Sequence, residues 1–177
     1  TADKFKDEFK AIEADADTIH VRINSPGGSV FEGLAIYNTL FASSKKIITY
    51  NDGLAASMGA LILLAGDEIH SFSNSLFMLH NASGMFAGNK KQIEEQLEVM
   101  DSIDKSLSTA IEERLGITSE EVKENYLNYK DNWFTAKQAE AAGFYDLIIK
   151  KKKALVPEDA INMNAGQLFD KYAAMSF

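Results

Sequence analysis

The chain has 177 residues, is 46% hydrophobic, carries a formal net charge of −8 and contains no cysteine. This length and apolar content suffice for one substantial core, so we expect a single main domain. The net negative charge argues against a nucleic-acid partner, because phosphate contacts need a concentrated basic face. The lack of cysteine excludes disulfides, thiol catalysis and thiolate metal sites, and it fits a reducing cytoplasm, which we take as the expected location.

No stretch has the pattern of a membrane segment or a signal peptide. The longest apolar run, Leu61 to Ala65, is far shorter than a membrane span. A lysine run from Lys150 to Lys153, followed by Pro157, marks a change of composition. We therefore expect a main domain over residues 1–153 and a C-terminal tail over residues 154–177, either disordered or with one short helix.

The first elements in chain order alternate between helix and strand. Apolar residues at helical spacing predict a surface helix over residues 2–13, and period-two alternation predicts a strand over residues 18–24. A broad apolar face predicts a helix over residues 30–41, and a β-branched run predicts a strand over residues 46–50. A strand, helix and strand in series form a right-handed crossover, so an α/β fold with a parallel sheet is expected.

The second half predicts shorter elements around one long helix. Apolar residues step by three or four from Asn89 to Arg114, and a helix of about 25 residues spans roughly 40 Å at 1.5 Å per residue. We expect this helix to project beyond the core and contact a partner. The other expected elements are a helix over 57–64, strands over 68–72 and 76–80, a loop over 81–89, a helix opening with a capping box at 118–121, a turn over 131–134, a short helix over 135–142 and a strand over 146–149.

Ser57 is the first candidate catalytic residue, because its neighbours are too small to shield its hydroxyl. The pattern Ala55-x-Ser57-x-Gly59 resembles the G-x-S-x-G nucleophile elbow, with alanine for the first glycine. At a helix start, free N–H groups and the positive end of the dipole can stabilise a negative charge. The alternative is an ordinary helix N-cap, the usual role of a serine at that position.

A serine nucleophile needs a base, and the chain has three histidines. His20 and His70 lie within strands and are expected to be structural or exposed. His80 ends a strand just before a glycine-containing loop, where open α/β sheets gather functional groups, although a structural histidine is equally typical there. For the acid that orients the imidazole, Asp131 and Asp146 both qualify, and spacing does not separate them.

A Pro26-Gly27-Gly28 turn follows directly after the first expected strand. Such a turn can present a backbone N–H to a developing oxyanion, or it can simply reverse the chain.

Four motifs follow one another along the chain: Asn24-Ser25-Pro26-Gly27-Gly28, Ala55-Ala56-Ser57-Met58-Gly59-Ala60, Met78-Leu79-His80-Asn81 and Asp131-Asn132-Trp133-Phe134-Thr135-Ala136. In this order they resemble the proteolytic subunit of the Clp proteases, over roughly residues 5–149. The resemblance implies a crotonase-like ββα spiral fold with the long helix as a projecting handle. It also implies Ser57 as nucleophile, His80 as general base and Asp131 as orienting acid, with the backbone N–H groups of Gly27 and Met58 forming the oxyanion hole.

The implied activity is that of a serine endopeptidase that needs no metal or cofactor. Members of that family bind polypeptide substrate as an added strand and form homo-oligomeric rings, often stacked in pairs. The glycine-rich segment after His80 would form a strand that completes the ring-to-ring handle with the long helix.

Within the family, residues 31–38 and 52–57 look most similar to phage and prophage members, which resemble head-maturation proteases. That likeness argues against an AAA+ unfoldase partner. The alternatives are a housekeeping proteolytic chamber fed by an ATPase, an acyl-CoA enzyme of the same fold and a catalytically inactive ring scaffold. Ser57 with His80 argues against the acyl-CoA enzyme, because such enzymes generally work without a serine nucleophile.

Overall fold

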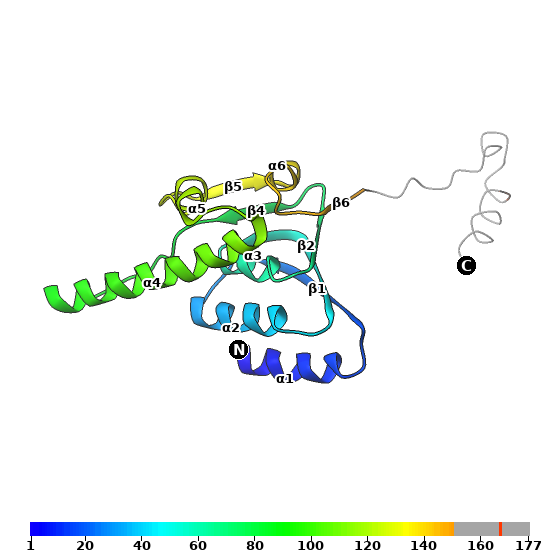
Figure 1. Cartoon of the computed structure of the whole chain (residues 1–177), viewed down its shortest axis with the longest axis horizontal. Coiled ribbons are helices and arrows are strands. Elements are labelled where there is room, and N and C mark those ends of the chain that lie inside the picture. Colours follow the sequence, from blue (N-terminus) through cyan, green and yellow to red (C-terminus); the bar gives the residue numbers. More distant parts are fainter. Residues whose placement is uncertain (151–166, 168–177) are drawn as a thin grey trace.

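The computed structural model describes residues 1–150 and residue 167, and the expected boundary at residue 153 lies outside them, as does the tail apart from residue 167. The described chain alternates helices and strands around one mixed sheet (Figure 1). In chain order the elements are α1 (Ala2–Glu13), β1 (Thr18–Ser25), α2 (Val30–Phe41), β2 (Lys46–Ala56), α3 (Met58–Leu63), β3 (Glu68–Phe72), β4 (Leu76–Leu79), α4 (Lys90–Leu115), α5 (Ser119–Asn125), β5 (Asn132–Thr135), α6 (Ala136–Ala141) and β6 (Leu147–Ile149).

The long strand β2 organises the sheet, because it changes partners along one of its edges. It pairs in parallel with β1 on one side. On the other side residues 48–51 pair with β3, and residues 54–56 pair with β4, again in parallel. Ala56 is opposite Met78 in this register, so the residues that follow each strand, Ser57 and His80, leave the sheet side by side. Strand β6 adds to β3, and β5 adds antiparallel to β4.

Helices cover the sheet in successive layers. Helix α3 packs on β1 and β2, α2 packs on α3, and α1 packs on α2. The largest apolar side chains of the core are fully buried, and each contributes about 1.5–3 kcal/mol by burial. They include Leu40, Ile47, Leu61, Leu63, Ile69, Phe77 and Ile111.

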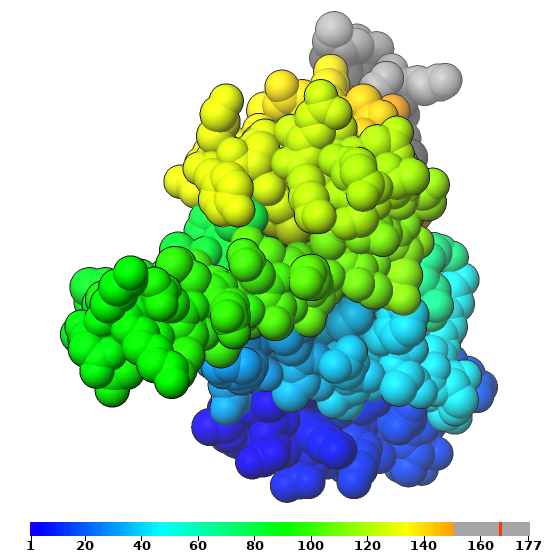
Figure 2. All heavy atoms as spheres, turned by 60° about the vertical axis from the view of Figure 1, so that its left-hand side comes forward, coloured from blue at the N-terminus to red at the C-terminus, as the bar shows by residue number. Residues whose placement is uncertain are grey.

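Helix α4 confirms the expected long helix. It begins with a capping box between Asn89 and Gln92 and ends at Gly116, which has φ 66° in the left-handed region. Its C-terminal half is buried at Leu107, Ala110 and Ile111, whereas its N-terminal half extends beyond the body of the protein (Figures 1 and 2). That half exposes the apolar side chains of Ile93, Leu97 and Val99.

Three sequence-based expectations were wrong. Strand β2 continues six residues beyond Tyr50, because pairing with β1 and β4 outweighs the weak strand propensity of its small and polar residues. Residues 132–135 form strand β5 where a turn was expected, since Phe77 and Met78 of β4 give them a partner. The segment after His80 forms no strand, because a ladder needs a second strand and none lies beside residues 81–89 within residues 1–150.

Within the described residues, no helix is both long and apolar enough to cross a lipid bilayer. The same residues hold no cluster of three or more histidine, aspartate or glutamate side chains arranged as a metal site would need.

Candidate active site

Ser57 lies at the sharp turn from β2 into α3. Its backbone has φ 54° and ψ −125°, a region in which a residue with a side chain is strained by about 1–3 kcal/mol. The Ser57 N–H donates to the carbonyl of Met78 at 3.0 Å, which fixes the turn against β4. Helix α3 begins at Met58, one residue later than expected, and the Ser57 hydroxyl makes no capping bond to it. Ser57 thus occupies the N-cap position of α3, but its hydroxyl does not cap the helix.

Glycines let the β1 end and the Ser57 turn approach closely. A Cβ at Gly27, which has φ 101°, would lie 2.7 Å from the Ser57 Cβ. A Cβ at Gly59 would lie 2.9 Å from the carbonyl oxygen of Ser25. Glycine at positions 27 and 59 is thus required by the contact between the two backbone turns.

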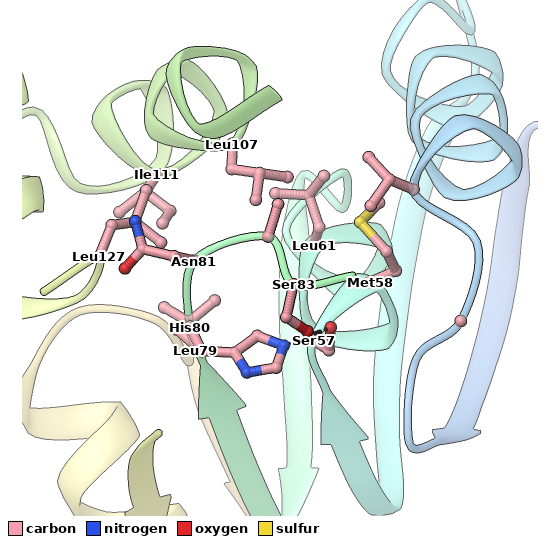
Figure 3. Close-up of a pocket in the computed structure, with 13 residues that line it drawn as sticks. Ser57, Met58, Leu61, Leu79, His80, Asn81, Ser83, Leu107, Ile111 and Leu127 are labelled. Atoms are coloured by element: carbon pink, nitrogen blue, oxygen red, sulfur yellow. Dashed lines mark hydrogen bonds between the residues drawn. The ribbon is translucent and has the colours of Figure 1, made fainter. Parts of the chain in front are cut away.

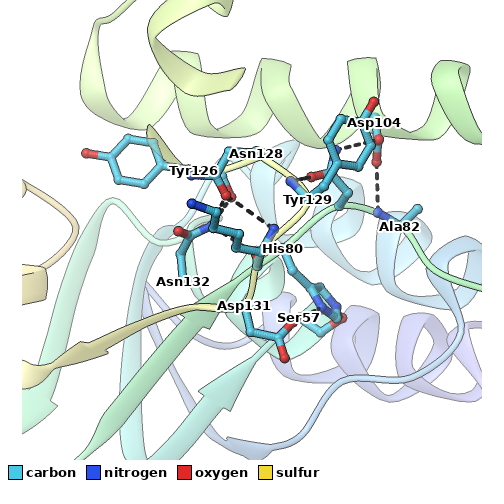
Figure 4. A network of polar contacts seen from close by, with 11 residues as sticks. Ser57, His80, Ala82, Asp104, Tyr126, Asn128, Tyr129, Asp131 and Asn132 are labelled. Atoms are coloured by element: carbon cyan, nitrogen blue, oxygen red, sulfur yellow. Dashed lines mark hydrogen bonds and ion pairs between the residues drawn. The ribbon is translucent and has the colours of Figure 1, made fainter. Parts of the chain in front are cut away.

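His80 follows β4 directly, and its imidazole lies between the serine and an acid (Figure 4). Its Nε2 is 2.8 Å from Ser57 Oγ, and its Nδ1 is 3.0 Å from Asp131 Oδ1. A carboxylate only accepts hydrogen bonds, so Nδ1 carries the proton and donates to Asp131. The Nε2 atom is then an acceptor for the serine hydroxyl.

The two candidate acids have different partners. Asp131 contacts His80, and its side chain is 63% exposed. Asp146 instead accepts hydrogen bonds from the Ile69 N–H at 2.7 Å and from Arg114 Nη2 at 2.8 Å. Asp146 therefore ties the β6 end of the chain to β3 and α4, and the contact with the imidazole belongs to Asp131.

The other two histidines lie on the sheet away from this turn, as expected. His20 Nδ1 is 2.8 Å from the Tyr50 hydroxyl. His70 Nε2 is 3.2 Å from Glu68, whose pKa is lowered by hydrogen bonds from Lys46 and then from His70.

Two backbone N–H groups near the serine are open to an oxyanion. Met58 is the first residue of α3, where N–H groups have no partner within the helix. The Gly27 N–H, the other expected donor, instead donates to Ser25 Oγ at 3.1 Å. Gly28 lines the pocket beside Ser57, and its N–H has no acceptor among the described residues. The free N–H is therefore that of Gly28, whereas the family resemblance implied that of Gly27.

A pocket opens next to the Ser57 hydroxyl (Figure 3). Its walls come from the start of α2, the end of β4, α3, α4 and the segments that follow β1, β4 and α5, and they are mostly apolar. The larger apolar residues are Val30, Met58, Leu61, Leu79, Leu107, Ile111 and Leu127.

Sequence reasoning missed two polar residues that support this site. Asn81 and Asp104 join the loop after β4 to helix α4 by hydrogen bonds of 2.7 and 2.8 Å. A signal existed for the second one. Asp104 precedes the buried Leu107 and Ile111 by three and seven residues, so it continues the buried stripe of its helix as a polar residue.

Comparison with known proteins gives the family. The Clp protease family model matches residues 3–152. The chain is 37% identical over 140 residues to the ATP-dependent Clp protease proteolytic subunit 1 of Leifsonia xyli subsp. xyli, covering 78% of this chain and 70% of the relative. It is 36% identical over 134 residues to proteolytic subunit 2 of Tropheryma whipplei, covering 75% and 73%. The chain belongs to the Clp protease family.

Membership of the Clp protease family confirms the expected α/β fold with its long helix, and it makes the chain a peptidase. A second subunit 1, from Corynebacterium jeikeium, is 37% identical over 137 residues, with 76% of this chain and 72% of the relative covered. The likeness to phage members stays a prediction.

Proposed function

We propose that the chain is a serine endopeptidase with Ser57 as nucleophile, His80 as general base and Asp131 as the acid that orients the imidazole. The observation that carries this proposal is the pair of contacts at 2.8 and 3.0 Å on opposite sides of one imidazole. The strained turn at Ser57 adds support, because it exposes a hydroxyl that no helix cap engages.

The proposed reaction follows from the protonation states at the site. His80 Nε2 takes the Ser57 proton as Oγ bonds to the carbonyl carbon of a peptide. The Met58 N–H and the Gly28 N–H stabilise the resulting oxyanion, each contributing on the order of 10²–10³ in rate. The imidazolium then protonates the leaving amine, and the C–N bond breaks. Water hydrolyses the acyl-enzyme by the same steps in reverse order.

The pocket supports an apolar preference at the cleaved bond. Leu61, Leu107 and Ile111 form its walls beside the nucleophile, so an apolar side chain next to the scissile bond loses the most water there. The polypeptide would bind as an extended segment along residues 81–83, which line the same pocket and form no strand. The protease unit that we propose spans residues 1–153.

We further propose that the protein works as a homo-oligomeric ring, which is stacked in pairs through the projecting part of α4. That part exposes Ile93, Leu97 and Val99, and a second copy would cover them.

Two biological settings follow for the ring. Head maturation, a prophage function without an unfoldase, rests on the likeness of residues 31–38 and 52–57 to phage members. The alternative is a housekeeping chamber fed by an ATPase, which the similarity to ATP-dependent bacterial subunits favours. Cleavage of a folded phage structural protein without ATP supports the first setting. Stimulation of degradation by an AAA+ unfoldase with ATP supports the second.

A fluorophosphonate probe tests the chemistry itself. We expect it to label the assembled protein at one residue, identified by mass spectrometry as Ser57, and to leave Ser57→Ala unlabelled. Ser43 is the matched control, because its partly buried hydroxyl donates to Glu13 and makes no hydrogen bond to a histidine. Ser43→Ala should label like the wild type. Failure of a correctly assembled wild-type ring to label would favour the inactive scaffold.

A further inference from the structure

Resting on the proposed function, we propose that Asp104 and Asn81 are positioning residues, which together hold His80 and Asp131 in line with Ser57. They form one chain of hydrogen bonds from helix α4 to both loops that carry these side chains (Figure 4).

The first part of the chain fixes the segment after the histidine. Asp104 accepts from the Ala82 N–H at 2.8 Å through Oδ1 and from Asn81 Nδ2 at 2.7 Å through Oδ2. Both oxygens of one carboxylate therefore anchor the two residues that follow His80. The sheet does not do this, because β4 ends at Leu79.

The second part reaches the acid. Asn81 Oδ1 accepts from the Tyr129 N–H at 2.7 Å, and Tyr129 lies two residues before Asp131. Tyr129 has φ 64°, so its peptide is held in a conformation that residues with side chains rarely adopt. A fixed hydrogen bond at this peptide sets the direction in which the chain leaves toward Asp131.

The carboxylate also fixes the orientation of the Asn81 amide. Because Asp104 can only accept, Asn81 must turn its NH₂ group to the helix and its oxygen to Tyr129. Asn81 is 9% exposed, so water competes little for either bond. Removing Asp104 would free the amide to rotate. The loops that carry His80 and Asp131 would then no longer be held in a fixed position relative to each other.

Such an anchor matters because Asp131 has little packing of its own. Its side chain is 63% exposed and that of His80 is 24% exposed. A displacement of about 1 Å at a reacting group lowers turnover by on the order of 100-fold.

The test compares four assembled variants, Asp104→Ala, Asp104→Asn, Asn81→Ala and Asp101→Ala, by the rate of fluorophosphonate labelling and by kcat and KM on a fluorogenic peptide. We expect Asp104→Ala and Asn81→Ala to lose about 100-fold in kcat and in labelling rate with KM little changed. Asp104→Asn keeps one acceptor and should lose less. Asp101 is the matched control, because it lies one turn away on α4 and its side chain makes no hydrogen bond to the described residues; Asp101→Ala should behave like the wild type.

A double-mutant cycle separates positioning from general loss of stability. If Asp104 acts through Asp131 and His80, its removal from an Asp131→Ala protein should cost about 10-fold less than its removal from the wild type. Size-exclusion chromatography and the melting temperature restrict each comparison to folded, assembled protein. Should Asp104→Ala fail to assemble, Asp104→Asn and Asn81→Ala decide.

Three outcomes overturn the proposal in different ways. Wild-type labelling of Asp104→Ala and Asn81→Ala, or losses that simply add in the cycle, would reject the positioning role alone. Absence of labelling in the wild type would reject the proposed function and this role together.

Discussion

The two halves of the candidate site are held by different forces. On the serine side, two backbone turns touch with glycines between them, and apolar residues of α3 pack beneath. On the histidine–aspartate side, His80 and Asp131 stand at strand ends in partly exposed positions. Polar contacts from Asp104, Asn81 and Asn132 hold the loops that carry them.

This difference predicts two kinds of failure. Close packing fails by collision, when an added atom pushes the turns apart. A polar tether fails by release, when a lost hydrogen bond lets a loop move while the fold stays intact. Substitutions on the two sides should therefore separate into those that reduce stability and activity together and those that reduce activity alone.

The largest expected effect comes from removing the nucleophile. Ser57→Ala should lower kcat on a fluorogenic peptide by on the order of 10⁶, because the residues of a working triad act as one unit. Adding His80→Ala should cause little further loss for the same reason. A residual kcat within about 100-fold of the wild type would contradict the nucleophile assignment.

Asp131→Asn should lower kcat by about 10⁴ with an unchanged melting temperature, because the amide no longer holds the required imidazole tautomer. Asp146→Asn is its matched control, since both are partly exposed aspartates next to short edge strands. It should leave kcat within a few-fold and lower the free energy of unfolding by about 1–3 kcal/mol, through the weakened Arg114 and Ile69 contacts. A large loss of kcat in Asp146→Asn, with kcat little changed in Asp131→Asn, would instead make Asp146 the acid that orients the imidazole.

Gly27→Ala tests collision on the serine side. Its Cβ would lie 2.7 Å from the Ser57 Cβ and 2.9 Å from the Ala56 carbonyl oxygen, so the turns must separate. We expect about 100-fold lower kcat together with a lower melting temperature. A lower kcat with an unchanged melting temperature would argue against a collision, because separated turns also lose packing.

The smallest expected effect is a change in the free energy of unfolding with pH, caused by Tyr37 on α2. Burial, and then the charge of Glu113, raise the pKa of Tyr37 to about 12 from its ordinary value of 10.0. Below pH 10 the phenol is neutral in both states. Between pH 10 and 12 only the unfolded chain ionises, so the free energy of unfolding should fall by about 3 kcal/mol over this window.

Urea denaturation between pH 9 and 12 measures this fall. Tyr37→Phe is the control, because it keeps the ring in its buried place and cannot ionise. An equal alkaline fall in both proteins would assign the effect to other groups.

Local patterns predicted the elements whose ends are set by local chemistry. Residues 2–13, 30–41 and the long helix were expected within one or two residues of their observed ends, because helical spacing and the Asn89 and Gly116 caps act within a few residues. The end of β2 and all of β5 were missed, since each exists through partners distant in the chain. Membership of one sheet is not visible in a four-residue stretch.

The site divides in the same way. Ser57 and His80 were predicted from their neighbours, because an elbow of small residues and a histidine at a strand end are local features. The choice of Asp131 over Asp146 needed the family resemblance, as spacing carries no information on which loop returns to the histidine. Asn81 and Asp104 were missed because a hydrogen bond between a loop and a helix has no sequence pattern of its own.

The backbone at residue 57 has a consequence for engineering. With φ 54° and ψ −125°, this position suits glycine better than any residue with a side chain. Selection for heat tolerance alone would therefore enrich Ser57→Gly, and with it molecules that lack the proposed nucleophile. A library screen that raises the working temperature of this protein has to score turnover in every round, or it will select against the enzyme it sets out to improve.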